Sequence, residues 1–202
     1  MRRNYAIILA GPNGAGKSSF ALDLLRHELD IHAFVNADLI AQALSPDDPD
    51  AVAIEAGRRM THLITRLIDG RSDFAFETTL SGYALTKTVR RLIGLGYEVD
   101  LVYLWLPAAD LAIQRVRSRV SLGGHSVPED VIIRRYERSL LNFDRVYRKL
   151  VTSWRVYHAA AAAAGKKQVP LIAWGRKDQV LEVVDPVAWE QMMSWYRERE
   201  GR

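Results

Sequence analysis

The chain has 202 residues, of which 49% are hydrophobic and 26% are charged, and its formal net charge is +4. This length and composition predict a single well-buried domain spanning residues 1–202, and the mild positive charge suits an anionic partner. The absence of cysteine excludes a disulfide framework and a thiolate metal site and suits the cytoplasm. No apolar run approaches the roughly 18 to 20 residues that cross a bilayer, so we expect a soluble protein that makes no membrane contact.

The first predicted element is a buried parallel strand formed by the apolar run "YAIILA" at residues 5–10. A segment with the pattern G-x-x-x-x-G-K-[ST] follows at once, and a helix with apolar residues at helical spacing comes next. Glycines allow positive φ and close backbone approach to phosphate, the lysine reaches the outer phosphates, and the Ser18 hydroxyl completes a Mg²⁺ shell. The predicted nucleoside triphosphate site comprises Gly11, Pro12, Asn13, Gly14, Ala15, Gly16, Lys17, Ser18 and Ser19.

Short apolar runs then alternate with amphipathic stretches along the rest of the chain. The predicted strands cover residues 33–38, 73–79, 98–107, 154–159 and 170–175. The predicted helices cover residues 52–67, 82–96, 110–122, 129–147 and 186–200, and the alanine-rich residues 159–165 are a loop or a helical turn. This alternation predicts an α/β fold with a mostly parallel sheet and helices on both faces.

Polar side chains follow the predicted strands, and the carboxyl ends of parallel strands share one crevice. They are Asn36, Asp38, Glu77, Thr78 and Thr79. Asp38 is placed to accept a hydroxyl proton, or alternatively caps a helix that begins at Leu39. Glu77 either orients a Mg²⁺ ion or simply ends its strand, and the two threonines are ligand-binding or ordinary strand-end hydroxyls.

The second half of the chain is rich in arginine. Arg115 and Arg119 are four residues apart and therefore lie on one helical face, which predicts contact with phosphate or a solvated surface. His125, in the polar break at residues 123–128, is either a lid residue or a surface residue. We expect a small lid region around residues 115–135.

Other nucleotide-binding classes lack their motifs here. The chain has no N-K-x-D motif of a switch GTPase, and its strongest strand ends in proline rather than in the paired acids of a transporter-type ATPase. Small-molecule kinases remain, since they need an acceptor pocket, a carboxylate near the acceptor hydroxyl and arginines around the transferring phosphate.

The segments "AGPNGAGKS", "FVNADLIA", "FAFETTLSG" and "GGHSVPEDVIIRRY" together resemble the zeta toxin family of P-loop kinases, from about Tyr5 to Trp154. The resemblance implies a P-loop kinase-type three-layer sandwich, ATP as the donor with Mg²⁺, and a small antitoxin as a partner. It also implies phosphorylation of the 3′-hydroxyl of UDP-N-acetylglucosamine.

The same resemblance implies roles for single residues. Lys17 and Ser18 match the phosphate loop, Asp38 takes the place of the catalytic base, and Glu77 and Thr78, with Thr79 alongside, lie in the motif that holds the sugar nucleotide. Arg115 is the candidate for the first of two arginines around the γ-phosphate, while the second falls at His125. The substitutes for that second arginine are Arg119, Arg134 and Arg135.

Two further functions stay open. One is a kinase that phosphorylates hydroxyls of polynucleotides or nucleosides, in which the arginine-rich half follows a phosphate backbone. No aromatic stacking platform lies among the arginines, so nucleic acid is the less favoured acceptor. The other is a non-catalytic nucleotide-binding switch.

Overall fold

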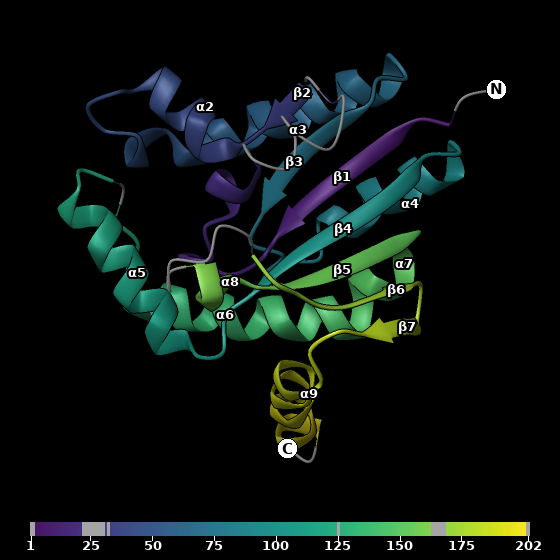
Figure 1. The fold of residues 1–202 in the computed structure, drawn as a ribbon. Helices are drawn as coiled ribbons and strands as arrows, with labels where there is room; N and C mark the ends of the chain where they lie inside the picture. The colour runs from purple at the N-terminus through teal and green to yellow at the C-terminus, as the bar shows by residue number, and fades with distance from the viewer. Residues whose placement is uncertain (1–2, 22–30, 32, 125, 163–168, 201–202) are drawn as a thin grey trace.

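The computed structural model describes residues 3–21, 31, 33–124, 126–162 and 169–200. Within these residues the strands form one seven-stranded sheet in the order β2-β3-β1-β4-β5-β6-β7 (Figure 1). The strands are β1 (Tyr5–Ala10), β2 (Ala33–Val35), β3 (Phe74–Thr78), β4 (Glu98–Trp105), β5 (Ser153–His158), β6 (Leu171–Arg176) and β7 (Gln179–Val183).

The first five strands are parallel, and β6 and β7 extend the sheet as an antiparallel hairpin. Strand β1 lies at the centre, with Leu9 opposite Glu77 of β3 on one side and Val102 of β4 on the other. The carboxyl ends of β1, β2 and β3 therefore meet at the same edge of the sheet, where parallel sheets bind their ligands.

Helices cover both faces of the sheet and fill its crossovers. A first helix begins at residue 17 and is described as far as residue 21. The others are α2 (Ala37–Leu44), α3 (Ala53–Asp69) after the 3₁₀ turn η1 (Asp50–Val52), α4 (Leu85–Gly94), α5 (Ala109–Ser121), α6 (Glu129–Asn142), the π-helical turn η2 (Phe143–Tyr147), α7 (Arg148–Leu150), α8 (Ala159–Ala162) and α9 (Pro186–Glu200).

The core has two parts because successive residues of β1 point to opposite faces of the sheet. Ala6, Ile8 and Ala10 join the larger cluster, which includes buried residues of α3, α4, α5 and α6. Ile7 and Leu9 join a smaller cluster with Ala21 of the first helix. The expected α/β fold, with a mostly parallel sheet between two helical layers, is thus confirmed.

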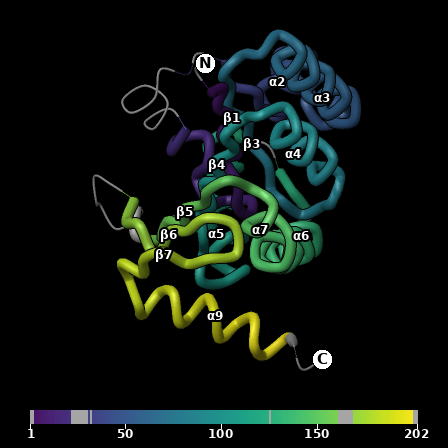
Figure 2. Tube along the Cα trace, turned by 90° about the vertical axis from the view of Figure 1, so that its right-hand side faces the viewer, coloured from purple at the N-terminus to yellow at the C-terminus, as the bar shows by residue number. Residues whose placement is uncertain are grey.

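The two ends of the sheet differ in their covering. Helices α2 and α3 pack together beside β2, whereas α9 lies at the opposite end beside β6 and β7 (Figure 2). Trp189 of α9 stacks on Trp154 of β5 with ring centroids 6.0 Å apart, which seals that end of the core. No helix in the described part of the chain is long and apolar enough to cross a membrane.

Candidate active site

The loop between β1 and the first helix has the backbone shape that its glycines predict. Gly11, Gly14 and Gly16 have φ angles of 144°, 75° and 80°. A Cβ atom at Gly11 would lie 2.5 Å from the carbonyl oxygen of Leu104, and one at Gly14 would lie 2.8 Å from that of Ala112. The loop therefore packs closely against β4 and α5, and both contacts require glycine.

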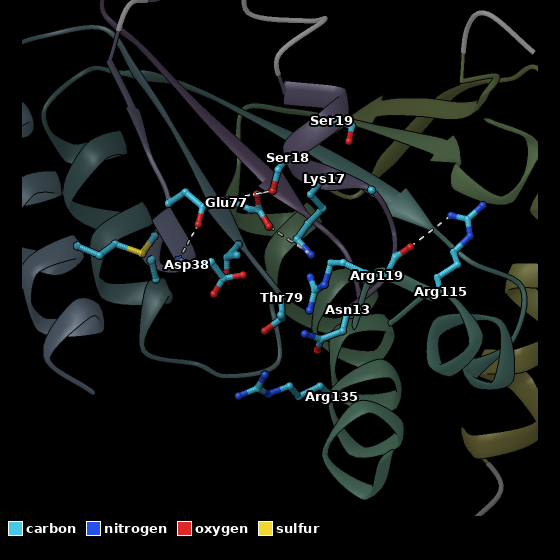
Figure 3. Close-up of a pocket in the computed structure, with 16 residues that line it drawn as sticks. Asn13, Lys17, Ser18, Ser19, Asp38, Glu77, Thr79, Arg115, Arg119 and Arg135 are labelled. Atoms are coloured by element: carbon cyan, nitrogen blue, oxygen red, sulfur yellow. Dashed lines mark hydrogen bonds and ion pairs between the residues drawn. The ribbon is translucent and has the colours of Figure 1, made fainter. Parts of the chain in front are cut away.

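Glu77, at the end of β3, joins three segments that are distant in sequence. Its Oε2 accepts hydrogen bonds of 2.7 Å from the Ser18 hydroxyl and of 2.7 Å from Asn36 Nδ2. Its Oε1 lies 3.6 Å from Lys17 Nζ, which also donates to the carbonyl of Pro12 at 3.1 Å. These contacts place the lysine, the serine and the asparagine around one carboxylate, and Figure 3 shows Lys17 and Ser18 beside Glu77.

Lys17 is buried, with 7% of its surface exposed. Burial lowers the pKa of the Lys17 ammonium below its ordinary value, while the nearby carboxylates of Glu77 and Asp38 act in the opposite direction. The ammonium is thus held in a partly desolvated place where an added phosphate would meet little competing water.

Asn36 is the N-cap of α2. Its Oδ1 accepts hydrogen bonds from the backbone N–H groups of Asp38 at 2.7 Å and of Leu39 at 3.2 Å. The alternative in which Asp38 caps a helix beginning at Leu39 is therefore wrong, because the helix begins at Ala37 and Asn36 supplies the cap. The predicted strand at residues 33–38 is also shorter, since it ends at Val35.

The turn after β3 uses its hydroxyls partly for its own shape. The Thr78 hydroxyl accepts a hydrogen bond from the Leu80 backbone N–H at 3.0 Å, and the Thr79 and Ser81 hydroxyls are 2.9 Å apart. Leu80 has a φ of 59°, a left-handed conformation that is uncommon for leucine. Asn142 Nδ2, at the end of α6, donates a hydrogen bond of 2.8 Å to the Leu80 carbonyl, so α6 fixes the turn.

The arginines differ in their surroundings. Arg115 donates to the carbonyls of Gly14 at 3.3 Å and of Ala159 at 3.1 Å, and burial lowers its pKa. Arg119 and Arg135 line the same cavity, whereas Arg134 is not among its lining residues and its guanidinium lies 3.7 Å from the Asp130 carboxylate. His125, the remaining predicted lid residue, lies outside the described residues.

These groups surround one cavity of about 570 Å³ (Figure 3). The predicted residues that line it are Asn13, Gly14, Gly16, Lys17, Ser18, Ser19, Asn36, Asp38, Glu77, Thr78, Thr79, Arg115, Arg119 and Arg135. Gly11, Pro12 and Ala15 are buried in the loop rather than on the cavity wall. Ala37 and Met60 also line the cavity, and no sequence signal marks them because only the packing of α2 and α3 brings them here.

The described residues offer few side-chain oxygens to a metal ion in this cavity. In the described part of the chain no group of three or more acidic or histidine side chains is arranged to hold a metal ion. The Ser18 hydroxyl and the Glu77 carboxylate are adjacent and are hard oxygen donors of the kind that Mg²⁺ prefers when phosphates supply further ligands.

The profile described as "Zeta toxin" matches residues 2–169 of this chain. The chain belongs to the zeta toxin family. An uncharacterized protein of Haemophilus influenzae is 32% identical over 137 residues, which are 66% of this chain and 94% of that protein.

Two solved structures are similar to this chain in fold. The PezAT chromosomal toxin-antitoxin system of Streptococcus pneumoniae has a chain that is 15% identical, with a TM-score of 0.66 over 100% of this chain and 87% of that one. A chain of the AvrRxo1-ORF1:-ORF2 complex with ATP is 14% identical, with a TM-score of 0.60 over 94% of this chain and 63% of that one. At these identities the likeness shows a shared fold.

Proposed function

We propose that this zeta toxin family member transfers the terminal phosphoryl group of ATP to a hydroxyl group of a small acceptor. One observation carries the proposal. The Asp38 carboxylate lines the same cavity as Lys17 and Ser18 and lies close enough to the lysine to influence its pKa. A phosphate site and a carboxylate able to accept a proton are the two parts that such a transfer needs.

The phosphate loop and its neighbours bind the donor in this proposal. Lys17 and the N-terminus of the first helix meet the negative charge of the outer phosphates. Ser18 and Glu77 are the residues that would hold Mg²⁺, which supplies charge neutralisation when bound. Arg119 and Arg135, from the lid region of residues 115–135, face the charge that develops on the transferring group.

Asp38 acts as the general base. It takes the proton of the acceptor hydroxyl as the hydroxyl oxygen forms its bond to phosphorus, while the bond to the ADP oxygen breaks. Because Asn36 already caps α2, the Asp38 carboxylate is not required for the helix end and is directed to the cavity. The resemblance to zeta toxins supplies UDP-N-acetylglucosamine as the first acceptor to assay.

The decisive experiment is the exchange Asp38→Asn, which keeps the shape of the side chain and removes its ability to accept a proton. We expect turnover to fall by about 10²- to 10⁴-fold while ATP affinity stays within a few-fold. Transfer is measured as the mass gain of one phosphoryl group on each of a panel of hydroxyl acceptors.

The matched control is Asp110→Asn, because Asp110 also lies in the first turn of a helix but is exposed and outside the cavity. It should transfer phosphate at the wild-type rate. A folded Asp38→Asn protein that retains near wild-type turnover would show that another group accepts the proton, with Glu77 as the next candidate.

A small antitoxin partner is the second part of the proposal, and membership in the zeta toxin family supports it. If phosphoryl transfer is harmful to the cell, induced expression of the wild-type chain in bacteria should arrest growth. Expression of the Asp38→Asn variant at the same level should not. Equal growth with both proteins would contradict a toxic activity. It would not bear on phosphoryl transfer, which the acceptor assay measures separately.

A further inference from the structure

The side-chain amide of Asn13, in the phosphate loop, makes no hydrogen bond to the described part of the chain. Its Oδ1 is buried without a partner, although the residue as a whole is only partly buried and lines the phosphate cavity. Asn36 lines the same cavity and uses both ends of its amide, since Nδ2 donates to Glu77 at 2.7 Å and Oδ1 accepts from the start of α2. Asn36 is thus part of the framework, whereas the Asn13 amide is free to bind another group.

The shape of the loop does not require an asparagine at this position. The backbone turns between Pro12 and Ala15, where the Ala15 N–H donates to the Pro12 carbonyl at 3.2 Å. The left-handed residue of this turn is Gly14, with a φ of 75°, and Asn13 precedes it at a position that most residues can occupy. A buried polar atom without a partner costs about 1–3 kcal/mol, which an apolar side chain would avoid. A ligand in the cavity is therefore the expected partner of the amide.

Asn13 lies on the arginine side of the cavity. In Figure 3 its side chain is drawn below Lys17, on the side away from Ser18 and toward Arg135. Ser18 and Glu77, the two residues proposed to hold Mg²⁺, are adjacent to each other on the opposite side of the lysine. A phosphoryl group that contacts the Lys17 ammonium would therefore have the metal site on one side and the amide on the other.

We propose that Asn13 is a further catalytic residue, whose Nδ2 donates a hydrogen bond to a non-bridging oxygen of the phosphoryl group during transfer. Because neither end of the amide is bonded to the protein, the side chain turns its Nδ2 toward an anion without breaking an internal hydrogen bond. The donor stabilises the negative charge of these oxygens while the bond to the ADP oxygen breaks and the bond to the acceptor oxygen forms. This inference rests on the proposed function, because it adds a residue to that same reaction.

Two exchanges distinguish this role from a role in the shape of the loop. Asn13→Ala removes the amide, and Asn13→Asp keeps its shape but replaces the donor with a negative charge. We expect kcat to fall about 10²-fold in Asn13→Ala, the usual loss for one transition-state donor, and further in Asn13→Asp. The KM for ATP should stay within about threefold in Asn13→Ala, because Lys17 and the loop backbone still bind the phosphates. If the residue were needed only for its shape, Asn13→Asp would retain nearly the wild-type kcat.

A binding measurement that needs no acceptor gives a second readout. Fluoroaluminate bound together with ADP and Mg²⁺ imitates a phosphoryl group in transfer, and calorimetry compares its complex with ADP and Mg²⁺ alone. Asn13→Ala should weaken binding of the fluoroaluminate complex about tenfold or more and leave the affinity for ADP unchanged. The matched control is Asn4→Ala, which removes an asparagine that precedes β1 and donates to Asp73 at 3.1 Å, far from the cavity. It should change neither kcat nor the two affinities.

A kcat for Asn13→Asp within about threefold of the wild type would overturn the inference, and so would equal losses of affinity for ADP alone and for the fluoroaluminate complex. Asn13→Asp alone serves in both measurements if Asn13→Ala does not fold. If the wild type phosphorylates no acceptor but binds fluoroaluminate through Asn13, the inferred contact stands and the proposed function fails. If it neither transfers phosphate nor binds fluoroaluminate, both fail.

Discussion

At the scale of single residues, Glu77 organises the candidate site. Its two carboxylate oxygens engage Ser18, Asn36 and Lys17, which come from the phosphate loop and from the start of α2. A carboxylate that accepts several hydrogen bonds fixes the side chains that donate them. In the proposed kinase this ordering of the side chains would reduce the conformational entropy lost on nucleotide binding.

Arg115 contacts carbonyl oxygens on both sides of the site. Its guanidinium joins Gly14 in the phosphate loop to Ala159 at the start of α8, which favours a positioning role over direct contact with the γ-phosphate. We expect Arg115→Ala to raise the KM for ATP at least as strongly as it lowers kcat. We also expect a loss of about 1–2 kcal/mol of unfolding free energy, because carbonyls lose their donors. Steady-state kinetics and urea unfolding measure the two effects.

The control for this prediction is Arg117→Ala, on the same helix, since Arg117 is exposed and pairs with Glu129 at the surface. Arg117→Ala should change the kinetic parameters and the unfolding free energy little. A large loss of kcat at unchanged KM in Arg115→Ala would instead assign the arginine to the transferring phosphate, as the resemblance implied.

At the scale of elements, two glycines in regular structure have opposite roles. A Cβ at Gly175 in β6 would lie 2.4 Å from the Trp154 ring and 2.1 Å from the Gln179 carbonyl oxygen, whereas a Cβ at Gly57 in α3 meets nothing within 4 Å. Gly175→Ala should lower the unfolding free energy by about 1–3 kcal/mol through overpacking. Gly57→Ala should raise it by about 0.5–1 kcal/mol through helix propensity. Urea unfolding of both variants measures this.

These two exchanges are each other's control, since both add one methyl group. A destabilising Gly57→Ala would indicate an unrecognised need for glycine in α3. A neutral Gly175→Ala would show that the β6–β7 hairpin shifts to admit the methyl group, with the Trp154 ring moving away from β6.

Much of this architecture is predictable from local patterns, and the exceptions have physical reasons. The strands with continuous apolar runs, such as β1 and β4, were found because burial on both faces leaves a clear signal. Strand β7 was missed because most of its side chains are exposed at the edge of the sheet. The sequence offers Asp38 as an alternative N-cap, and the cap is in fact Asn36, because both residue types are good caps and the strand boundary decides between them.

The candidate site likewise has one part that local sequence patterns predict and another that depends on tertiary packing. The phosphate loop and Glu77 follow from a motif and from strand ends, so the sequence identifies them. The entry of Met60 depends on how α2 and α3 pack, and no local pattern contains that information, whereas Arg135 is among the arginines that the resemblance names.

At the scale of the whole molecule, one buried carboxylate couples stability to pH. Asp100 of β4 accepts from the Ser153 hydroxyl at 2.9 Å and pairs with Arg155 of β5, yet burial raises its pKa above the ordinary value of 3.8. The native state then holds this proton more tightly than the unfolded chain, so its contribution to stability is lost as pH rises through the native pKa. Asp100→Asn should therefore gain stability relative to the wild type as the pH rises above 3.8.

Urea unfolding of wild type and variant at several pH values measures this difference. The same exchange at Asp178, an exposed residue in the β6–β7 turn, should give a difference that does not change with pH. If the difference in unfolding free energy between Asp100→Asn and the wild type stays constant, or if the variant loses stability relative to the wild type as the pH rises, the attraction of Arg155 outweighs the cost of burial.

The strand order also determines when the phosphate loop is completed during synthesis on the ribosome. Strand β1 is made first, but its neighbours β3 and β4 follow only at residues 74–78 and 98–105. The Ala159 carbonyl that holds Arg115 comes later still. At the usual elongation rate of about 5–20 residues per second, roughly 7–30 s separate Lys17 from that carbonyl. The nascent chain thus carries its phosphate-loop sequence long before the sheet that shapes it is complete.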